Sequence, residues 1–330
     1  MLAAILLIAL RLTIGWHFFY EGVWKVANSD EFSALPFLNL AKGPFAPIFY
    51  SMTPDLEGRI RMKLDEKQGV IPCQAYKTPW AQQKEYVLKN YTLSDTQKDD
   101  IDAVYTQYSE SLDTFLAAKY NDVQGYFISL DLLKKDKFNG NDGPEQHKRH
   151  WDTMMKLRGE MNGWLNAIEG LGADMNKAFE SILAQEKESQ AQRGTKHLPE
   201  IIPLTDRMPL GVTFPFASWT CFLNFTITWA LTAIGFCLIT GFCTRLAAIG
   251  GALFLCSVCM TQPAWPTIYP FDHPILGHAL VVDKNFVEMV ALFALATMPV
   301  GRWAGLDWFV WNWFGKPILN YYGFQQWTEE

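Results

Sequence analysis

The sequence predicts an all-α protein: a four-helix transmembrane bundle with an inserted extramembrane antiparallel helical hairpin domain. The first observation behind this is the distribution of charge, because 22 of the 28 basic and 27 of the 34 acidic residues lie within 28–212. The second is that the charge-poor remainder contains four long apolar segments. The third is a recurrence of apolar residues at steps of three and four within the charged part, which is typical of amphipathic helices.

The four apolar segments are 2–20, 216–241, 245–260 and 286–300. A helix that crosses a bilayer needs about 20 predominantly apolar residues. The first two segments meet this length, whereas the last two are short and need their flanking residues. We therefore expect four crossings, with both chain ends on the same side of the membrane.

Basic residues near the span ends predict the orientation. Arg245, Arg302 and Lys316 lie on the side of the chain ends, whereas the short loop 261–284 carries only Lys284. Lys and Arg are enriched in cytoplasmic loops. The sequence therefore predicts a multi-pass protein of the cytoplasmic (inner) membrane with cytoplasmic termini and a periplasmic segment 28–212.

Residues 28–212 are predicted to form an extracytoplasmic helical domain. Ser94 and Gln97 have the spacing of a capping box, and NGNDGP at 139–144 separates two helical patterns. We expect an antiparallel hairpin of 94–138 and 144–190, whose apolar faces either pack together or bind a partner protein. The remaining divisions are a first transmembrane helix (1–27), transmembrane helices two to four (213–303) and an aromatic interfacial tail (304–330).

The first span carries an unusual number of ionisable residues. Arg11, Gly15, Phe18, Gly22 and Lys25 fall on one face of a helix with 100° per residue. The two glycines allow another helix to approach closely. An Arg in the centre of a bilayer costs roughly 2.5–3.5 kcal/mol on insertion scales. This face should therefore turn into the bundle.

Arg11 is predicted to lie near the membrane midplane, about nine residues from the start of the first span. No acidic residue is expected at that depth. The polar residues expected there are Asn224 and Thr228 of the second span. These three residues are the candidates for binding an anion, a quinone carbonyl or a lipid headgroup. The alternative is that Arg11 donates to backbone carbonyls or extends along its stem to the interface. If Arg11 binds a ligand, Arg11→Leu should leave the bundle stable.

A second group of charges is expected at the outer boundary. Lys25 follows Glu21 by four residues, which favours a local ion pair, and Glu288 begins the fourth span on the same side. We predict that these three form an intramembrane charge network.

Two further patterns allow a chemical and a structural interpretation. Cys256 and Cys259 have the spacing of a redox dithiol, although a buried Cys is also a small apolar residue. Asp272, His273 and His278 have a spacing that fits a metal site or an ordinary loop. Nothing in the sequence suggests nucleic-acid binding.

Three motifs resemble the DoxX-like membrane proteins. They are R-x3-G-x2-F-x3-G-x2-K from Arg11, GFCTRLAAIGGALFL at 241–255 and DKNFVEMVALFALATMPVGRWAGLD at 283–307. The resemblance implies a four-helix membrane bundle. Because the family includes a membrane subunit of thiosulfate:quinone oxidoreductase, one implication is quinone-linked sulfur chemistry, with quinone as the candidate cofactor. The chain departs from the compact family pattern by its domain 28–212, which leaves the thiosulfate activity open.

Two function classes follow. The first is a quinone-linked or thiol-linked redox subunit that acts with a partner in the lipid membrane. The second is a non-catalytic scaffold or assembly subunit whose outer helical hairpin binds partner proteins. A cavity at Arg11, or an accessible Cys256–Cys259 pair, would favour the first, and a closed bundle would favour the second.

Overall fold

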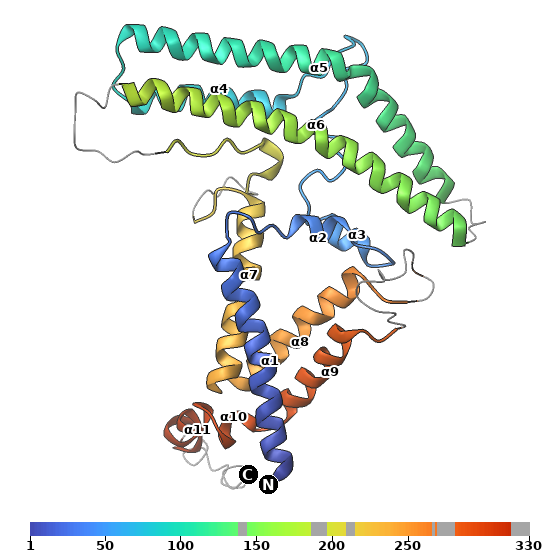
Figure 1. The fold of residues 1–330 in the computed structure, drawn as a ribbon, viewed down its shortest axis with the longest axis vertical. Coiled ribbons are helices and arrows are strands. Elements are labelled where there is room, and N and C mark those ends of the chain that lie inside the picture. Colours follow the sequence, from blue (N-terminus) through green and yellow to red (C-terminus); the bar gives the residue numbers. More distant parts are fainter. Residues whose placement is uncertain (138–143, 186–196, 209–214, 266–267, 269–280, 318–330) are drawn as a thin grey trace. The chain divides into compact units, whose positions relative to one another are not determined.

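The computed structural model describes residues 1–137, 144–185, 197–208, 215–265, 268 and 281–317 (Figure 1). Over these ranges the chain forms helices and no strands, apart from two isolated β-bridges. The all-α prediction is confirmed. The chain divides into two compact units, one formed by Met1–Met52 with Thr220–Glu330 and the other by Thr53–Trp219. We call them the membrane unit and the helical unit.

Three helices of the membrane unit are long and apolar enough to cross a membrane. They are α1 (Leu2–Ala27), α7 (Trp219–Thr240) and α8 (Thr244–Thr261). They correspond to the first three predicted spans. By length and composition, the protein is therefore a membrane protein.

The segment expected as the fourth span forms a shorter helix. Helix α9 (Lys284–Thr297) has 14 residues, which is about 21 Å at 1.5 Å per residue, against about 30 Å of hydrocarbon. Asp283 caps its first turn by accepting from the amide of Phe286 at 2.7 Å. The helix ends at Thr297 because Pro299 disfavours the helical conformation at Met298, which is extended. A single turn, α10 (Val300–Trp303), follows.

Glycines bring α1 and α7 into close contact. A Cβ at Gly22 would lie 2.5 Å from the amide nitrogen of Thr232, and one at Gly15 would lie 2.9 Å from the Cβ of Leu238. From the other side, a Cβ at Gly235 would overlap the backbone of Phe19. The predicted close approach at the glycine face of the first span is confirmed, and α7 is the helix that makes it.

The core of the membrane unit is apolar and joins all of its long helices. Helices α8 and α9 lie side by side (Figure 1). The fully buried side chains at their contacts come from α1, α7, α8, α9 and α10, and they include Phe18, Leu238, Ala248, Leu292 and Val300.

Residues 28–52 pack in the membrane unit, although the sequence places them with the outer domain. They contain two short helices, α2 (Leu35–Asn39) and α3 (Ala46–Tyr50). Leu38 and Phe49 bury their side chains in a small cluster with Leu223 of α7. The amide of Lys42 also donates to the carbonyl of Thr261 at the end of α8.

The helical unit is built on two long helices that lie side by side, α5 (Asp95–Lys137) and α6 (Pro144–Gln185) (Figure 1). The predicted capping box starts α5: the Gln97 amide donates to Ser94 Oγ, and the Ser94 amide donates to Gln97 Oε1. The apolar residues of both helices share one core with a third helix, α4 (Gln74–Asn90). A short 3-10 helix, η2 (Leu204–Asp206), follows α6.

Helix α6 runs without a break through Gly170 and Gly172. The reason for Gly172 is packing, because a Cβ there would lie 2.9 Å from Nε1 of Trp80. Trp80 of α4 is only 1% exposed, so the missing side chain at Gly172 makes room for the indole.

The aromatic tail begins with two short helical segments, α11 (Asp307–Val310) and the π-helical turn η5 (Trp311–Gly315). Trp308 and Trp313 are exposed on it. The rest of the predicted tail lies outside the described residues.

Candidate functional site

Arg11 is the most buried charged side chain of the membrane unit, with 2% of its surface exposed. Its Nη2 donates to the carbonyl of Ala304 at 2.7 Å, and its Nη1 donates to the carbonyl of Val300 at 3.3 Å. Both carbonyls belong to the chain that leaves α9 through α10. Arg11 therefore satisfies backbone acceptors that the end of a helix leaves without an intrahelical partner. Its Nε has no hydrogen-bond partner.

Two glycines make room for the Arg11 guanidinium. A Cβ at Gly241 would lie 2.6 Å from Nη1, and a Cβ at Gly305 would lie 2.9 Å from it. The same added atoms would collide with the Cα of the other glycine. Gly241 also has φ +68°, which favours glycine. The turn after α7 and the chain after α10 therefore contact each other next to the Arg11 guanidinium, and this contact requires glycine at both positions.

Asp307 contributes a negative charge to the same contact. Its carboxylate accepts from the amides of Cys243 at 2.7 Å and Thr244 at 2.9 Å, which are the first amides of α8. A carboxylate is favoured at a helix N-terminus because the amides there lack partners and carry positive partial charge. In return, the amide of Asp307 donates to the carbonyl of Gly241 at 2.7 Å.

We call Arg11, Gly241, Thr244, Gly305 and Asp307 the Arg11–Asp307 cluster. It brings together residues from three separate parts of the membrane unit: the first span, the turn between α7 and α8, and the chain that follows α10. The charges of Arg11 and Asp307 attract each other. The sequence analysis did not identify Asp307 as the acidic partner of Arg11, although Asp307 is the last residue of the motif at 283–307.

The position of Arg11 differs from the predicted one. Its guanidinium is level with Gly241, where α7 ends, and not with the middle of α7. The physical reason is the direction of helical side chains, which lean toward the N-terminus of their helix, so that Arg11 reaches toward the end of the bundle. The alternative interpretation, that Arg11 donates to backbone carbonyls, describes its contacts.

Asn224 and Thr228 are not brought together with Arg11. Asn224 Oδ1 accepts from the amide of Ala34 at 3.0 Å, and its Nδ2 donates to the carbonyl of Phe32 at 3.2 Å. Asn224 thus holds the segment that precedes α2 against α7. Thr228 is buried one turn further along α7.

The three predicted boundary charges do not form one network. They belong to two separate pairs, one of which includes His17. Lys25 Nζ contacts Glu21 at 2.7 Å within α1. Glu288 of α9 instead lies 3.1 Å from His17 Nδ1. His17 replaces Lys25 as the partner of Glu288 because it lies about two turns closer to the middle of α1, within contact distance of α9.

Cys256 and Cys259 line one cavity of about 150 Å³ at the end of α8, together with Met260, Asp283 and Met289. The Cys256 sulfur is 3.9 Å from the Met260 sulfur, and the Cys259 sulfur is 3.9 Å from an Asp283 oxygen. Both thiols are free. The helix presents them to the same cavity because they are three residues apart.

Asp272, His273 and His278 lie outside the described residues. Within the ranges that the structure describes, no three His, Cys, Asp or Glu side chains form a group suited to a metal.

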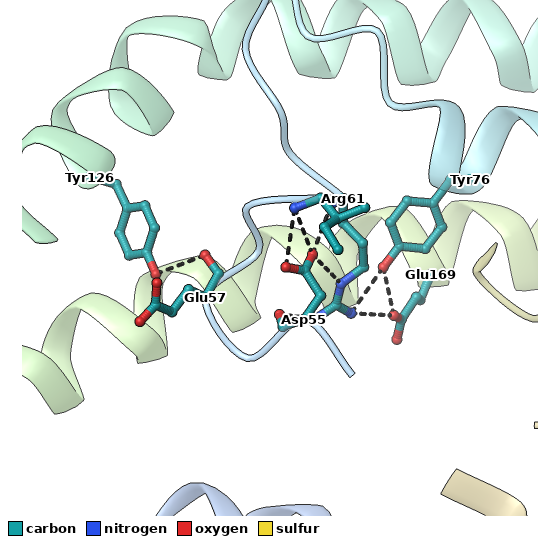
Figure 2. Close-up of polar contacts among 7 residues, drawn as sticks. Asp55, Glu57, Arg61, Tyr76, Tyr126 and Glu169 are labelled. Carbon is teal, nitrogen blue, oxygen red and sulfur yellow. Dashed lines mark hydrogen bonds and ion pairs between the residues drawn. The ribbon is translucent and has the colours of Figure 1, made fainter. Parts of the chain in front are cut away.

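The helical unit contains a separate, partly buried polar network (Figure 2). Asp55 accepts from the amides of Ile60 and Arg61 and is paired with the Arg61 guanidinium at 3.4 Å. Arg61 extends to Glu169 of α6, which also accepts from Tyr76 of α4 at 2.8 Å. Burial is the main reason that the pKa of Tyr76 is raised. The network ties the segment before α4 to α4 and α6, and its groups satisfy one another.

Glu57 and Tyr126 extend this arrangement along α5. Tyr126 donates to the backbone carbonyl of Glu57 at 3.1 Å (Figure 2). Burial raises the pKa of Tyr126 to about 12. The Glu57 carboxylate pairs with Arg59 and Lys134, and these two cations hold its pKa below the ordinary value despite burial. These contacts hold the loop on the long helices.

The chain matches no protein-family model, no curated protein and no solved structure.

Proposed function

We propose that this chain is a DoxX-like membrane protein that acts as a non-catalytic scaffold. In this proposal α1, α7, α8 and the shorter α9 cross the bilayer as a four-helix bundle. The helical unit lies outside the bilayer as an inserted domain and binds a partner protein. The single observation that carries the proposal is the enclosure of Arg11 by backbone carbonyls, glycines and the charge of Asp307.

The residues around Arg11 do not fit a quinone. Its two terminal nitrogens already donate to Val300 and Ala304, and 98% of its surface is covered. The remaining donors, including the unpaired Nε, are enclosed by the groups packed around the guanidinium, so a quinone carbonyl could reach them only if those groups moved apart. The neutral polar residues Asn224 and Thr228 do not face the guanidinium from the other side.

Four crossings are supported by the way α9 packs. It runs along α8, and Leu292 and Leu295 are fully buried in the membrane unit. Charged groups mark its two ends, with Glu288 paired to His17 near the start and Arg302 just beyond it. A helix shorter than the hydrocarbon layer is accommodated by local thinning of the bilayer at a modest cost.

The orientation rests on the basic residues Arg245, Arg302 and Lys316, which place the α7–α8 turn and the tail in the cytoplasm of a bacterial inner membrane. The helical unit is then periplasmic. Its surface offers an apolar pair to a partner, because Ile128 and Leu132, one turn apart on α5, are each 56% exposed.

The test compares Arg11→Leu with Lys25→Leu, a cation of the same helix that lies outside the cluster. If the protein is a scaffold, Arg11→Leu should lower the melting temperature in detergent, because it leaves two buried carbonyls and the charge of Asp307 without their partner. Lys25→Leu should lower it less. The sequence, which reveals no partner of Arg11, predicted instead that Arg11→Leu would leave the bundle stable. Quinone extracted from the purified protein should not depend on Arg11.

A quinone-binding subunit would give the opposite pair of results. The parent protein would carry close to one quinone per chain, and Arg11→Leu would lose it while keeping its melting temperature. That outcome would remove the proposal.

A thiol-linked redox subunit is the second candidate, and the cavity shared by Cys256 and Cys259 favours it. In such a step the two thiols would form a disulfide and release two electrons and two protons to an acceptor such as a quinone. Oxidation of the intact protein by a short-chain quinone should then lower its mass by about two hydrogens. Cys256→Ser should abolish this change, and an unchanged mass in the parent protein would reject the candidate.

A further inference from the structure

A second cavity, of about 200 Å³, opens beside the Arg11–Asp307 cluster, between the start of α8 and the chain from α10 to η5. We call it the arginine pocket. The lining residues that matter here are Thr244, Arg245, Arg302, Asp307 and Trp311. All of them belong to the membrane unit.

The two arginines bring positive charge to the arginine pocket without a balancing contact. Across the described part of the chain, neither Arg245 nor Arg302 makes an ion pair with a carboxylate. The pKa of Arg302 is lowered first by burial and then by the charge of Arg245, with Asp307 acting in the opposite direction, so the two guanidinium groups repel each other. An anion between them would relieve this repulsion.

The negative charge of Asp307 attracts Arg302 as well as Arg11, so it offsets only part of the positive charge in the arginine pocket, and its oxygens are already engaged. They accept from the amides of Cys243 and Thr244, and the buried Arg11 offsets the charge from behind. The start of α8 is therefore occupied by Asp307, and an incoming anion would be held by side chains.

The Thr244 hydroxyl points independently to a ligand. Thr244 is 1% exposed, and its Oγ1 has no hydrogen-bond partner. A buried hydroxyl without a partner costs about 1–3 kcal/mol. Since Thr244 lines the arginine pocket, an oxygen bound there would supply the missing contact.

Arg302 lies over an aromatic ring, which favours such a contact. Its guanidinium carbon lies 3.9 Å from the centre of the Trp311 ring. Stacking on an aromatic face leaves the edge of a guanidinium free for two parallel hydrogen bonds, the geometry that suits phosphate oxygens.

The surroundings of the arginine pocket are those of a membrane interface. Exposed aromatic side chains lie on the same short segments, at Trp303, Trp308, Phe309 and Trp313, and Leu246 beside the cavity is 71% exposed. Trp is enriched where headgroups meet the hydrocarbon layer. A ligand at this depth would have its apolar part in the bilayer and its anionic part at the arginines.

We propose that the arginine pocket binds the phosphate group of an anionic phospholipid headgroup through Arg245, Arg302 and the Thr244 hydroxyl. The proposal concerns the end of the membrane unit and holds whether or not the chain is a scaffold.

The test measures binding of short-chain phosphatidylglycerol to the full-length protein in a non-ionic detergent by native mass spectrometry. The comparison lipid is short-chain phosphatidylcholine, whose headgroup has no net charge. The parent protein should bind phosphatidylglycerol preferentially. Arg245→Gln with Arg302→Gln should weaken that binding about 10-fold or more, because hydrogen bonds to charged groups are the strong ones.

Three further variants keep the test decisive if the double variant fails to fold. Arg302→Lys retains the charge but loses the planar edge, and Thr244→Val removes only the hydroxyl, so each should weaken binding of phosphatidylglycerol. Lys316→Gln removes a cation of the same tail that does not line the arginine pocket, and it should bind like the parent. The melting temperature of each variant is measured beside the binding.

The source of the phosphate is tested by competition with inorganic phosphate and with glycerol phosphate. Weak competition by both supports a lipid headgroup, because the acyl chains then contribute to affinity. Binding of free phosphate that depends on the arginines but is not displaced by lipid would overturn the lipid assignment. Equal binding of the two lipids, or unchanged binding in folded Arg302→Lys and Thr244→Val, would overturn the site.

Discussion

Arg11 and Asp307 carry opposite charges at the end of the membrane unit, and each charge is offset by backbone groups as well as by the other. Arg11 donates to the carbonyls after α9, and Asp307 accepts from the amides that start α8. Removing one partner from such an arrangement is costly because it leaves the other buried without compensation.

Asp307→Asn should therefore destabilise the membrane unit. The amide keeps one acceptor oxygen for the start of α8 but loses the charge that faces Arg11, and we expect a loss of about 1–3 kcal/mol. The melting temperature in detergent measures this effect, and the exposed Asp30→Asn is the matched control. Equal melting temperatures for the two variants would show that the Arg11–Asp307 cluster does not hold the turn.

Cys73 makes stability depend on pH in the helical unit. Burial raises the pKa of its thiol from the ordinary value of 9.0 to about 12. Between these values the folded state holds a proton that the unfolded state releases, so stability falls as pH rises above about 9. We expect unfolding by denaturant to become easier from pH 8 to pH 10, and Cys73→Ala should flatten this dependence. A steeper or unchanged slope in Cys73→Ala would contradict the assignment.

At the scale of elements, the helix starts and apolar faces were predictable because they depend on local patterns. Ser94 and Gln97 cap α5 as their spacing indicates, and Ile101, Leu112 and Val123 of its apolar stripe are fully buried. Helix α4 was not foreseen. It contains Pro79, has few apolar residues and is stabilised by burying Tyr76 and Trp80 against other helices, which a local pattern does not reveal.

The Arg11–Asp307 cluster was only partly predictable for a different reason. Glycine spacing and the cost of a charge in lipid correctly place Arg11 inside the membrane unit. Its partners are the carbonyls of Val300 and Ala304, which any residue type could supply, so the sequence cannot identify them. The residues that bear a signal are Gly241 and Gly305, where a side chain would collide with Arg11.

Two glycines of α6 give a matched test of helix packing. Gly172 faces Trp80, whereas a Cβ at Gly170 would meet no atom within 4 Å. Gly170→Ala should stabilise the helical unit by up to about 1 kcal/mol, because alanine is the better helix former. Gly172→Ala should destabilise it, because the buried Trp80 must move. The free energies of unfolding by denaturant decide between these outcomes, and equal effects would contradict the packing of α4 on α6.

At the scale of the whole molecule, the chain consists of two units with different chemistry. The membrane unit contains three helices long and apolar enough to cross a membrane, and its buried Arg11 has backbone acceptors and the charge of Asp307 as partners within the unit. The helical unit has its own apolar core and its own polar network. This division supports the proposal that the helical unit lies outside the bilayer, on the side opposite the α7–α8 turn.

Labelling of introduced cysteines in intact cells tests this claim most directly. The variants are Lys135→Cys on the helical unit and Lys316→Cys on the tail, each compared with the parent protein, whose own six cysteines give the background. A membrane-impermeant thiol reagent should label Lys135→Cys in intact cells and Lys316→Cys only after the cells are lysed. Labelling of both sites in intact cells, or of Lys135→Cys only after lysis, would contradict the proposed topology.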